Sequence, residues 1–309
     1  MKKILVIVPA YCEEETIYET VSALKNISGP LSDTGFDLSV YVINDGSTDA
    51  TAQKAREAGA DRVVHHRVNQ GLGSAVRTGL QAAWKDGADI AVKFDADLQH
   101  DPKDILELIQ PILDDEAEIV YGNRLERINY KMPMIRRMGN IAFTRLMRWM
   151  THWPVVDSQP GIFAVARDFL EVFYLPGDYN YSQQILLDAF HKGMRFAQVP
   201  VSFNPRTTGS SFVSFKYPFK VLPQILQVLV GIKPLKVFGP VALFFLGIGT
   251  IVAVFNLLCW FAGMTEKPIQ QANLVLGSGL FGLQTLFFGL LADLIVKQNA
   301  NIRKSNDRS

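Results

Sequence analysis

The sequence contains few cysteines and no excess of charge of either sign. Cys12 and Cys259 are the only cysteines among 309 residues, which excludes a zinc cluster and a disulfide framework. The net charge is +1 and no long basic block occurs, so a strongly basic nucleic-acid binder is excluded and no nucleic-acid partner is expected. The apolar run at residues 4–8 is too short for a secretory signal peptide and predicts a first strand.

Hydrophobic residues make up 48% of the chain and are concentrated in its last third. Two apolar stretches, at about 238–263 and 274–296, are long enough to cross a bilayer as helices. The short polar link at 265–268 predicts an antiparallel hairpin with both outer ends on one side. The alternative is a pair of buried core helices in a soluble protein.

Positive charges flank both outer ends of this predicted hairpin. They are Lys233 and Lys236 before the first stretch, and Lys297, Arg303, Lys304 and Arg308 after the second. By the positive-inside rule, they predict that the N-terminal domain is cytoplasmic. The chain is expected to be an integral protein of the plasma membrane.

The first 125 residues alternate short apolar runs with helical patterns. This alternation predicts an α/β fold with a mostly parallel sheet flanked by helices. Open α/β sheets bind ligands beyond the carboxyl ends of their strands, so functional side chains are expected in the loops that follow the strands. The predicted strands are Ile4–Val8, Leu38–Ile43, Arg62–His65, Ile90–Phe94 and Glu118–Tyr121.

Two carboxylates, Asp95 and Asp97, follow the predicted strand at 90–94. Mg²⁺ and Mn²⁺ typically take one or two protein carboxylates and complete their coordination with water and substrate phosphate oxygens. The pair is therefore interpreted as a site for one of these cations. The alternative is a solvated acidic turn.

Polar loops also follow the first two predicted strands. Tyr11 could stack on a planar base, and Glu13 could either accept a hydrogen bond from a ribose hydroxyl or serve as a first-turn acid of a helix. Asn44 and Asp45 could accept a hydrogen bond from a nucleobase edge, whereas Asp49 is predicted to cap the helix that follows.

The run Asn69-Gln-Gly-Leu-Gly73 is a weak glycine-rich signal. It lacks the third glycine of the dinucleotide fingerprint, so a Rossmann cofactor site is excluded. It is expected to let the next helix begin beside the nucleotide.

Several motifs occur with the residues and in the order of a known family. They are Pro9-Ala-Tyr-Cys-Glu13, Asn44-Asp-Gly-Ser-Thr-Asp49, Asn69-Gln-Gly-Leu-Gly73 and Asp95-Ala-Asp-Leu-Gln-His-Asp-Pro102. Over about the first 210 residues, the chain resembles the inverting GT-A glycosyltransferases of family two, and within them the polyprenyl-phosphate branch that includes dolichol-phosphate mannose synthase. Cys12 departs from the family pattern, which has Asn at this position.

The resemblance implies a site for a UDP- or GDP-linked sugar and for Mg²⁺ or Mn²⁺. The implied metal ligands are Asp95, Asp97 and Gln99. The implied nucleotide-sugar contacts are Pro9, Tyr11, Glu13, Asn44, Asp45, Gly71, Asp95 and Ala96.

Further elements of this family recur in the middle of the chain, and several contain arginine. They are Gly122-Asn-Arg124, Arg136-Arg137, Asp157-Ser-Gln-Pro-Gly161 and Arg206-Thr-Thr-Gly-Ser210. A guanidinium group binds phosphate oxygens bidentately and keeps its charge. The resemblance implies an acceptor-phosphate site of Arg124, Arg136, Arg137, Arg206 and Ser210, and catalytic residues Asp97, Asp157, Arg124 and Arg206.

Alternatives stay open for some of these residues. Asp157 could act as a base, or it could hold Arg124 or Arg206 in place. Arg136 and Arg137 also fit solvated surface arginines.

The implied reaction is a single inverting displacement in which undecaprenyl or dolichyl phosphate attacks the anomeric carbon of the donor. A phosphate monoester is anionic near neutral pH and needs no strong base. Two alternatives are a processive polysaccharide synthase and a non-catalytic nucleotide-sugar binding protein. The first should carry a Gln-x-x-Arg-Trp motif, yet Arg148-Trp149 has no glutamine at the required offset.

The sequence predicts four segments. They are a catalytic domain at 1–211, an amphipathic juxtamembrane segment at 212–235, two transmembrane helices within 236–298, and a cytoplasmic tail at 299–309. A helix at about 132–150 has an apolar face suited to a membrane surface, or to packing on the sheet. The paired spans could associate into a homo-oligomer.

Overall fold

The computed structural model describes residues 1–33, 35–128, 134–175, 180–205, 230–231 and 233–306. The chain divides into two units, Met1–Pro218 and Phe219–Ser309, and each is described by itself.

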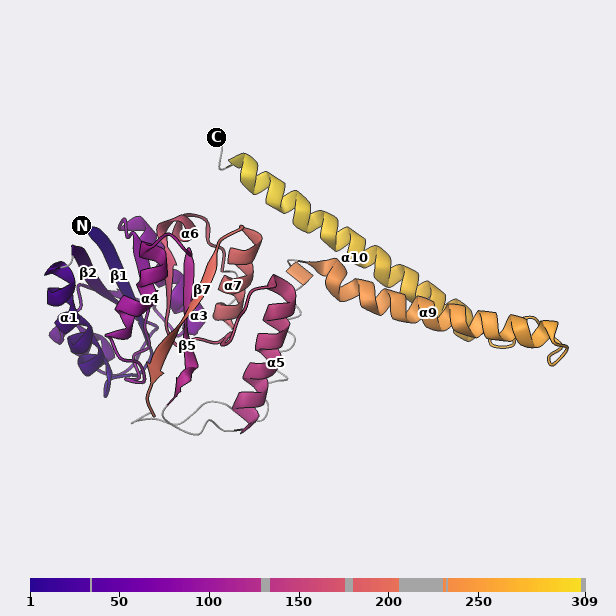
Figure 1. Cartoon of the computed structure of the whole chain (residues 1–309), viewed down its shortest axis with the longest axis horizontal. Coiled ribbons are helices and arrows are strands. Elements are labelled where there is room, and N and C mark those ends of the chain that lie inside the picture. The colour runs from indigo at the N-terminus through magenta and orange to yellow at the C-terminus, as the bar shows by residue number, and fades with distance from the viewer. Residues whose placement is uncertain (34, 129–133, 176–179, 206–229, 232, 307–309) are drawn as a thin grey trace. The chain divides into compact units, whose positions relative to one another are not determined.

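The first unit is built on one seven-stranded sheet with the strand order β3-β2-β1-β4-β6-β5-β7. Figure 1 labels β1, β2, β5 and β7 of this sheet. Strands β1 to β4 are parallel, β6 is antiparallel to both of its neighbours, and β5 is parallel to β7. The mostly parallel α/β fold predicted from the sequence is confirmed. The strands are β1 (Lys2–Ala10), β2 (Phe36–Asn44), β3 (Arg62–His65), β4 (Ile90–Lys93), β5 (Ile119–Ile128), β6 (Phe163–Ala166) and β7 (Phe196–Phe203).

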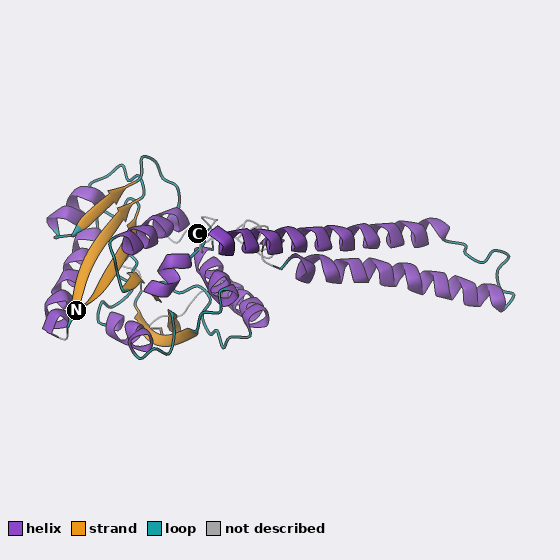
Figure 2. Cartoon of the chain, turned by 90° about the horizontal axis from the view of Figure 1, so that it is seen from above, coloured by secondary structure: helices purple, strands orange, loops and turns teal. Residues whose placement is uncertain are grey.

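Helices cover both faces of this sheet (Figure 2). The central strand β1 is buried from Ile4 to Ala10, as expected for a parallel strand covered on both sides. The helices are α1 (Ile17–Asp33), α2 (Thr51–Glu57), α3 (Leu72–Lys85), α4 (Asp104–Leu113), α5 (Met134–Thr151), α6 (Arg167–Val172) and α7 (Tyr181–His191).

Side-chain alternation along β1 separates the two layers. Ile4 and Val6 join the core cluster that includes residues of α1 and α4. Ile7 faces α3 instead, because a Cβ on Gly79 of α3 would lie only 2.1 Å from Ile7 Cγ2. Glycine at position 79 thus lets α3 lie close to the sheet.

The second unit contains α9 (Pro234–Phe261) and α10 (Ala272–Asn306). Its two candidate spans, Pro234–Phe261 and Ala272–Gln298, are long and apolar enough to cross a membrane. Large apolar side chains on both helices are exposed, for example Ile251 and Phe287. Core helices of a soluble protein would bury such side chains, so this exposure favours the membrane interpretation.

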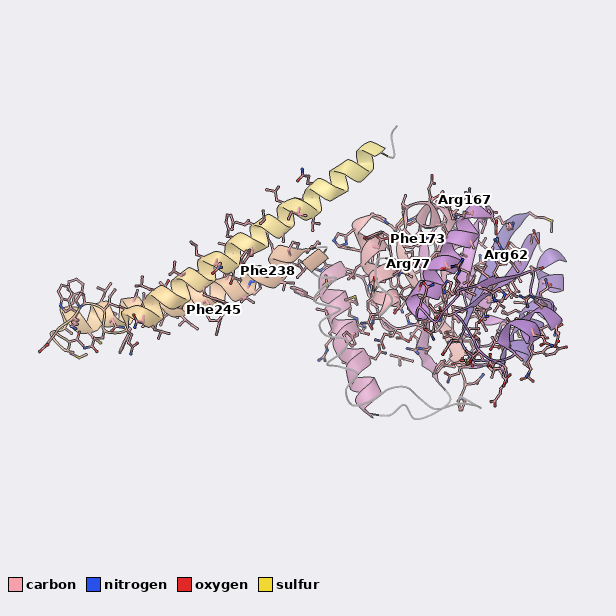
Figure 3. All side chains as sticks on the ribbon, turned by 180° about the vertical axis from the view of Figure 1, so that it is seen from behind. Arg62, Arg77, Arg167, Phe173, Phe238 and Phe245 are labelled. Atoms are coloured by element: carbon pink, nitrogen blue, oxygen red, sulfur yellow. The ribbon has the colours of Figure 1, made fainter. Side chains whose placement is uncertain are left out.

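The contact between α9 and α10 depends on glycine. A Cβ on Gly282 would lie 2.8 Å from Leu246 Cγ and 2.9 Å from Leu246 N. Phe245, labelled in Figure 3, packs edge-on against Phe281, with ring centroids 4.6 Å apart. Close approach through small residues is typical of helix pairs in lipid.

Candidate active site

The carboxyl ends of β1, β2 and β4 meet at one edge of the sheet. Ala10 pairs with Asn44, and Ile7 of β1 pairs with Lys93 at the end of β4. The loops that carry Tyr11, Asp45 and Asp95 therefore leave the sheet on the same side, where the sequence predicts the ligand site.

Lys93 is a buried cation at the end of β4, directly before the acidic loop. Its ammonium group donates hydrogen bonds to a carboxylate oxygen of Asp95 and, over 2.6 Å, to the carbonyl oxygen of Gly161. It also lies 5.6 Å from the ring centroid of Tyr181. Burial by itself would lower the pKa of Lys93, but Asp95 and Tyr181 together outweigh burial and raise that pKa above its ordinary value. Lys93 thus stays charged and orients Asp95.

The rest of the acidic loop is held by backbone contacts. The carbonyl oxygen of Ala96 accepts a hydrogen bond from Thr20 Oγ1 of α1 at 3.1 Å, and the Gln99 amide N–H donates to Asp97 Oδ1 at 3.2 Å. Gln99 Nε2 donates to the carbonyl oxygen of Asn204 at 3.0 Å. Leu98 adopts a left-handed backbone with φ of +60°, which is unusual for this residue type and typical of loops with a function.

Gly161 and His100 pack tightly beside Asp95. A Cβ on Gly161 would lie 2.0 Å from His100 Nε2 and 3.0 Å from Asp95 Oδ2, so any side chain at position 161 would displace one of them. His100 is 4% exposed, and its Nδ1 lies 3.1 Å from the carbonyl oxygen of Ser202. Burial lowers the pKa of His100 to about 4, so the ring is neutral at pH 7 and Nδ1–H donates to Ser202.

Arg124 and Asp157 form a buried, two-point ion pair. Arg124 Nε donates to Asp157 Oδ2 at 2.8 Å and Nη2 donates to Oδ1 at 3.2 Å. Asp157 is completely buried and also accepts from Asn140 Nδ2 at 3.3 Å and from the Gln159 N–H at 3.0 Å. The guanidinium lies 5.1 Å from the ring centroid of Phe203. This geometry favours the interpretation in which Asp157 holds Arg124 in place.

Asp45 organises the glycine-rich loop. It is buried, and its Oδ1 accepts from His66 Nδ1 at 2.6 Å and from the Gln70 N–H at 3.0 Å, while Oδ2 accepts from the Gly71 N–H at 2.8 Å. His66 Nε2 lies 2.9 Å from Thr78 Oγ1 of α3. Asp45 thus has a structural task in addition to the base contact predicted for it.

The other predicted nucleotide residues surround this loop. Tyr11 is 47% exposed, as a stacking surface for a base requires. Glu13 precedes α1, and its carbonyl oxygen accepts the N–H groups of Thr16 and Ile17. Asn44 Oδ1 accepts the Ser47 N–H at 3.0 Å, and Pro9 is buried in β1.

The N-cap of α2 is Ala50, so Asp49 lies one residue before the position predicted for it, yet its side chain still accepts a hydrogen bond from the start of the helix. Asp49 Oδ1 accepts the N–H of Thr51, the first residue of α2, at 3.1 Å.

A pocket of about 560 Å³ opens beside these groups. Of the predicted residues, Gly71, Asp95 and Arg124 line it together. Arg136 and Arg137 lie in the first turn of α5, whereas Arg206 and Ser210 lie outside the described residues.

Sequence reasoning missed several residues of this region. Lys93 and His100 contact or flank Asp95, His66 contacts Asp45, and Tyr181 and Gln183 line the pocket. A lysine inside the apolar run 90–94 is a signal that could have pointed to Lys93, because a buried lysine needs a partner. Nothing local in the sequence distinguishes Gln183.

The donor set fits a hard divalent cation. Asp95, Asp97 and Gln99 offer carboxylate and amide oxygens, the ligands that Mg²⁺ and Mn²⁺ prefer. Within the described parts of the chain, no three His, Cys, Asp or Glu side chains gather into a complete metal centre. A cation held by two carboxylates and completed by substrate phosphate oxygens does not require such a cluster.

The mostly parallel sheet, its flanking helices and the acidic loop after a central strand define a GT-A nucleotide-sugar transferase. The chain belongs to glycosyl transferase family 2, whose family model matches residues 5–173. It is a glycosyltransferase of the polyprenyl-phosphate branch.

Two curated relatives illustrate that branch. A UDP-N-acetylglucosamine–dolichyl-phosphate N-acetylglucosaminyltransferase of Methanococcus voltae is 31% identical, over 65% of this chain and 85% of its own length. An undecaprenyl-phosphate mannosyltransferase of Micrococcus luteus is 28% identical, over 69% of this chain and 88% of its own length.

Among solved structures, the glucosyl-3-phosphoglycerate synthase of Mycobacterium tuberculosis shares the fold. The crystal structure with Mn²⁺, UDP and phosphoglyceric acid has a TM-score of 0.57 and 24% identity, covering 74% of this chain and 78% of that chain. Another crystal structure of the same protein contains Mg²⁺ and UDP.

Proposed function

We propose that this protein transfers a sugar from a UDP- or GDP-linked donor to a polyprenyl phosphate, undecaprenyl or dolichyl phosphate, on the cytoplasmic face of the plasma membrane. The observation that carries the proposal is the pocket that Asp95 and Arg124 line together. A carboxylate suited to a metal–diphosphate complex and a guanidinium suited to a phosphate thus share one cavity. The relatives named for transfer to dolichyl and undecaprenyl phosphate support this choice of acceptor.

The donor side of the site would use the loops after β1, β2 and β4. Asp95, Asp97 and Gln99 would hold Mg²⁺ or Mn²⁺, which neutralises charge on the departing nucleoside diphosphate. Tyr11 would stack on the base, and Asp45 would keep the Gly71 loop beside the nucleotide. Pro9, Glu13, Asn44 and Ala96 complete the proposed donor contacts.

The acceptor side would use Arg124, whose guanidinium Asp157 orients for a contact with the lipid phosphate. Arg136, Arg137, Arg206 and Ser210 are proposed to help bind this phosphate. An acceptor phosphate oxygen forms a bond to the anomeric carbon as the bond from that carbon to the diphosphate oxygen breaks. The configuration inverts, and no side chain needs to remove a proton from the ionised phosphate. Most of the rate enhancement would come from positioning and charge stabilisation.

The membrane would bring the acceptor to the site. Helices α9 and α10 are proposed to span the bilayer as a hairpin, and α5 to lie at its surface, in the four-segment arrangement 1–211, 212–235, 236–298 and 299–309. A polyprenyl phosphate stays in the bilayer, so an enzyme anchored there meets its acceptor at high local concentration.

The test is an assay of the purified full-length protein in detergent with Mg²⁺ or Mn²⁺. Undecaprenyl or dolichyl phosphate is combined with UDP-glucose, UDP-N-acetylglucosamine, UDP-glucuronate or GDP-mannose, and products are identified by mass spectrometry. One sugar per lipid phosphate is expected, together with loss of turnover in the folded Asp97→Ala variant. A long glycan chain would indicate a processive synthase, and binding without any product would indicate a nucleotide-sugar binding protein; either result overturns the proposal.

A further inference from the structure

Amide side chains dominate the pocket that Asp95 and Arg124 line. An amide carries both hydrogen-bond donors and an acceptor but no charge, which matches the hydroxyl groups of a sugar. The five amide residues are Asn69, Gln70, Gln159, Asn180 and Gln183.

Gln183 is the most informative of these residues. It lies in the first turn of α7 and is only 2% exposed. Its Oε1 accepts a hydrogen bond from Ser182 Oγ at 3.3 Å, whereas its buried Nε2 has no hydrogen-bond partner among the described residues. Nδ2 of Asn180, in the same pocket, is also buried without a partner there. Buried donors in native proteins are nearly always paired with protein or water, so two such donors in one cavity need acceptor oxygens, which the hydroxyl groups of a bound sugar can supply.

The charged side chains that line the pocket indicate whether the sugar is neutral or carries a carboxylate. Asp95 and Arg124 are the charged side chains among the described residues that line it. Each already has a counter-ion, because Lys93 pairs with Asp95, and Asp157 pairs with Arg124 through two hydrogen bonds. The proposed function assigns Arg124 to the acceptor phosphate, so a carboxylate on the sugar would find no further cation among the described lining residues, whereas hydroxyl groups would pair with the amides at no charge penalty.

We propose that Gln183 and Asn180 bind hydroxyl oxygens of the donor sugar, and that this sugar is uncharged, a hexose or an N-acetylhexosamine rather than a uronate. The inference rests on the proposed function, because it places the sugar next to the diphosphate site at Asp95 and the acceptor site at Arg124. It assigns Gln183 as a residue that determines donor specificity.

The experiment compares nucleotides with and without a sugar. Calorimetry on the full-length protein in detergent with Mg²⁺ measures binding of UDP, UDP-glucose, UDP-N-acetylglucosamine and UDP-glucuronate, and of GDP and GDP-mannose. The wild type is expected to bind a neutral nucleotide sugar more tightly than UDP-glucuronate. Gln183→Leu is expected to lower the affinity for that nucleotide sugar about tenfold, whereas the affinity for the free nucleotide should stay the same within about twofold.

Two further variants serve as a control outside the pocket and as a second substitution at position 183. Gln110→Leu is the matched control, because Gln110 is an exposed helical glutamine of α4 that does not line the pocket, and unchanged binding is expected. Gln183→Met keeps an unbranched side chain of similar length, adds no charge and loses the donor, and it tests the same interaction if the leucine variant folds poorly. Circular dichroism checks the fold of each variant.

Three results would overturn the inference while the proposed transferase function stands. They are preferred binding of UDP-glucuronate, equal weakening of nucleotide and nucleotide sugar by Gln183→Leu, and a Gln183→Leu effect confined to the KM for the lipid phosphate. Failure of the wild type to bind any nucleotide sugar would instead overturn the proposed function, and the inference with it.

Discussion

At the residue scale, the loop after β1 contains a backbone conformation that suits its side chain poorly. Cys12 has φ of +53°, in the left-handed region that asparagine adopts more readily than most residues. Its amide N–H donates to Ser47 Oγ at 3.0 Å, which holds the loop in this conformation. Asparagine is the usual residue here in the family that the sequence resembles, and the backbone explains why.

Replacing this cysteine by asparagine should therefore stabilise the protein. Cys12→Asn is expected to raise the Tm by about 2–4 °C, corresponding to about 1 kcal/mol of relieved backbone strain. Thermal unfolding of the full-length protein in detergent measures the change. Cys12→Ala is the control, because alanine removes the sulfur but keeps the unfavourable φ, and it should not raise the Tm. A lower Tm for Cys12→Asn than for the wild type would contradict this account.

A second residue-scale prediction concerns the role of Asp157. In Asp157→Asn, Arg124 loses its buried counter-ion and its fixed orientation, so we expect kcat to fall about 100-fold. The shape of the pH–rate profile should stay the same, because Asp157 positions Arg124 and does not remove a proton. Arg124→Lys, which cannot form the two-point pair, should behave similarly. A profile that loses only its acidic limb in Asp157→Asn would show instead that Asp157 is a base.

At the element scale, the junction between β5 and β7 is stabilised at the points where these strands begin. Glu118 directly precedes β5, and its carboxylate accepts the Arg195 N–H at 2.6 Å and Arg195 Nε at 2.9 Å. Burial raises the pKa of Glu118, but the hydrogen bonds from Arg195 outweigh burial and lower it below its ordinary value of 4.5. The ionised carboxylate is thus favoured in the folded state.

This shift predicts a pH-dependent effect of Glu118→Gln. Because the pKa is lower in the folded protein, the contribution of Glu118 is fully present above pH 4.5 and is lost as the pH falls through the lowered value. Glu118→Gln should lower the Tm by about 2 °C at pH 7, and the difference should narrow as the pH is taken below 4.5. Thermal unfolding in buffers from pH 7 to pH 3.5 tests this, and a difference that grows in acid would contradict it.

The helix pair α9–α10 offers a matched comparison of two glycines. A Cβ on Gly282 would meet the backbone of Leu246, whereas one on Gly277 would meet nothing within 4 Å. Gly282→Val should therefore separate the helices and destabilise the hairpin by about 2 kcal/mol, and Gly277→Val should have little effect. Thermal unfolding in detergent compares the two variants, and equal effects would show that the packing at Gly282 is unimportant.

At the scale of the whole molecule, the main prediction concerns orientation in the membrane. Lysine and arginine flank the outer ends of the two candidate spans, so both chain ends are expected in the cytoplasm, with the link at 265–268 on the opposite side. Reporter fusions after residue 309 and within 265–268 should therefore report opposite sides. A cytoplasmic signal from the link would contradict the hairpin. An external signal from the C-terminus would show that the orientation is the reverse of the one predicted.

Much of the architecture follows from local pattern. Apolar runs of strand length alternate with helical periodicity, so the strands at 4–8, 38–43, 62–65 and 90–94 could be located to within two residues at each end. The order of the strands could not be predicted from the sequence, because β6 is only four residues long and lies antiparallel between β4 and β5. Nothing in its sequence specifies which neighbours it pairs with.

In the site, too, some features follow from local sequence pattern and others only from the tertiary structure. Residue type and spacing placed the acidic pair Asp95 and Asp97 after a strand and predicted the apolar hairpin, since both features are properties of short contiguous segments. The contacts that give the site its chemistry link distant segments: Lys93 with Gly161, and Arg124 with Asp157. The chain folds the loop at 157–161 against the acidic loop because β6 follows it between β4 and β5. Only that tertiary arrangement pairs the charges and leaves the amide of Gln183 in the pocket, because contacts across many residues depend on strand order rather than on local pattern.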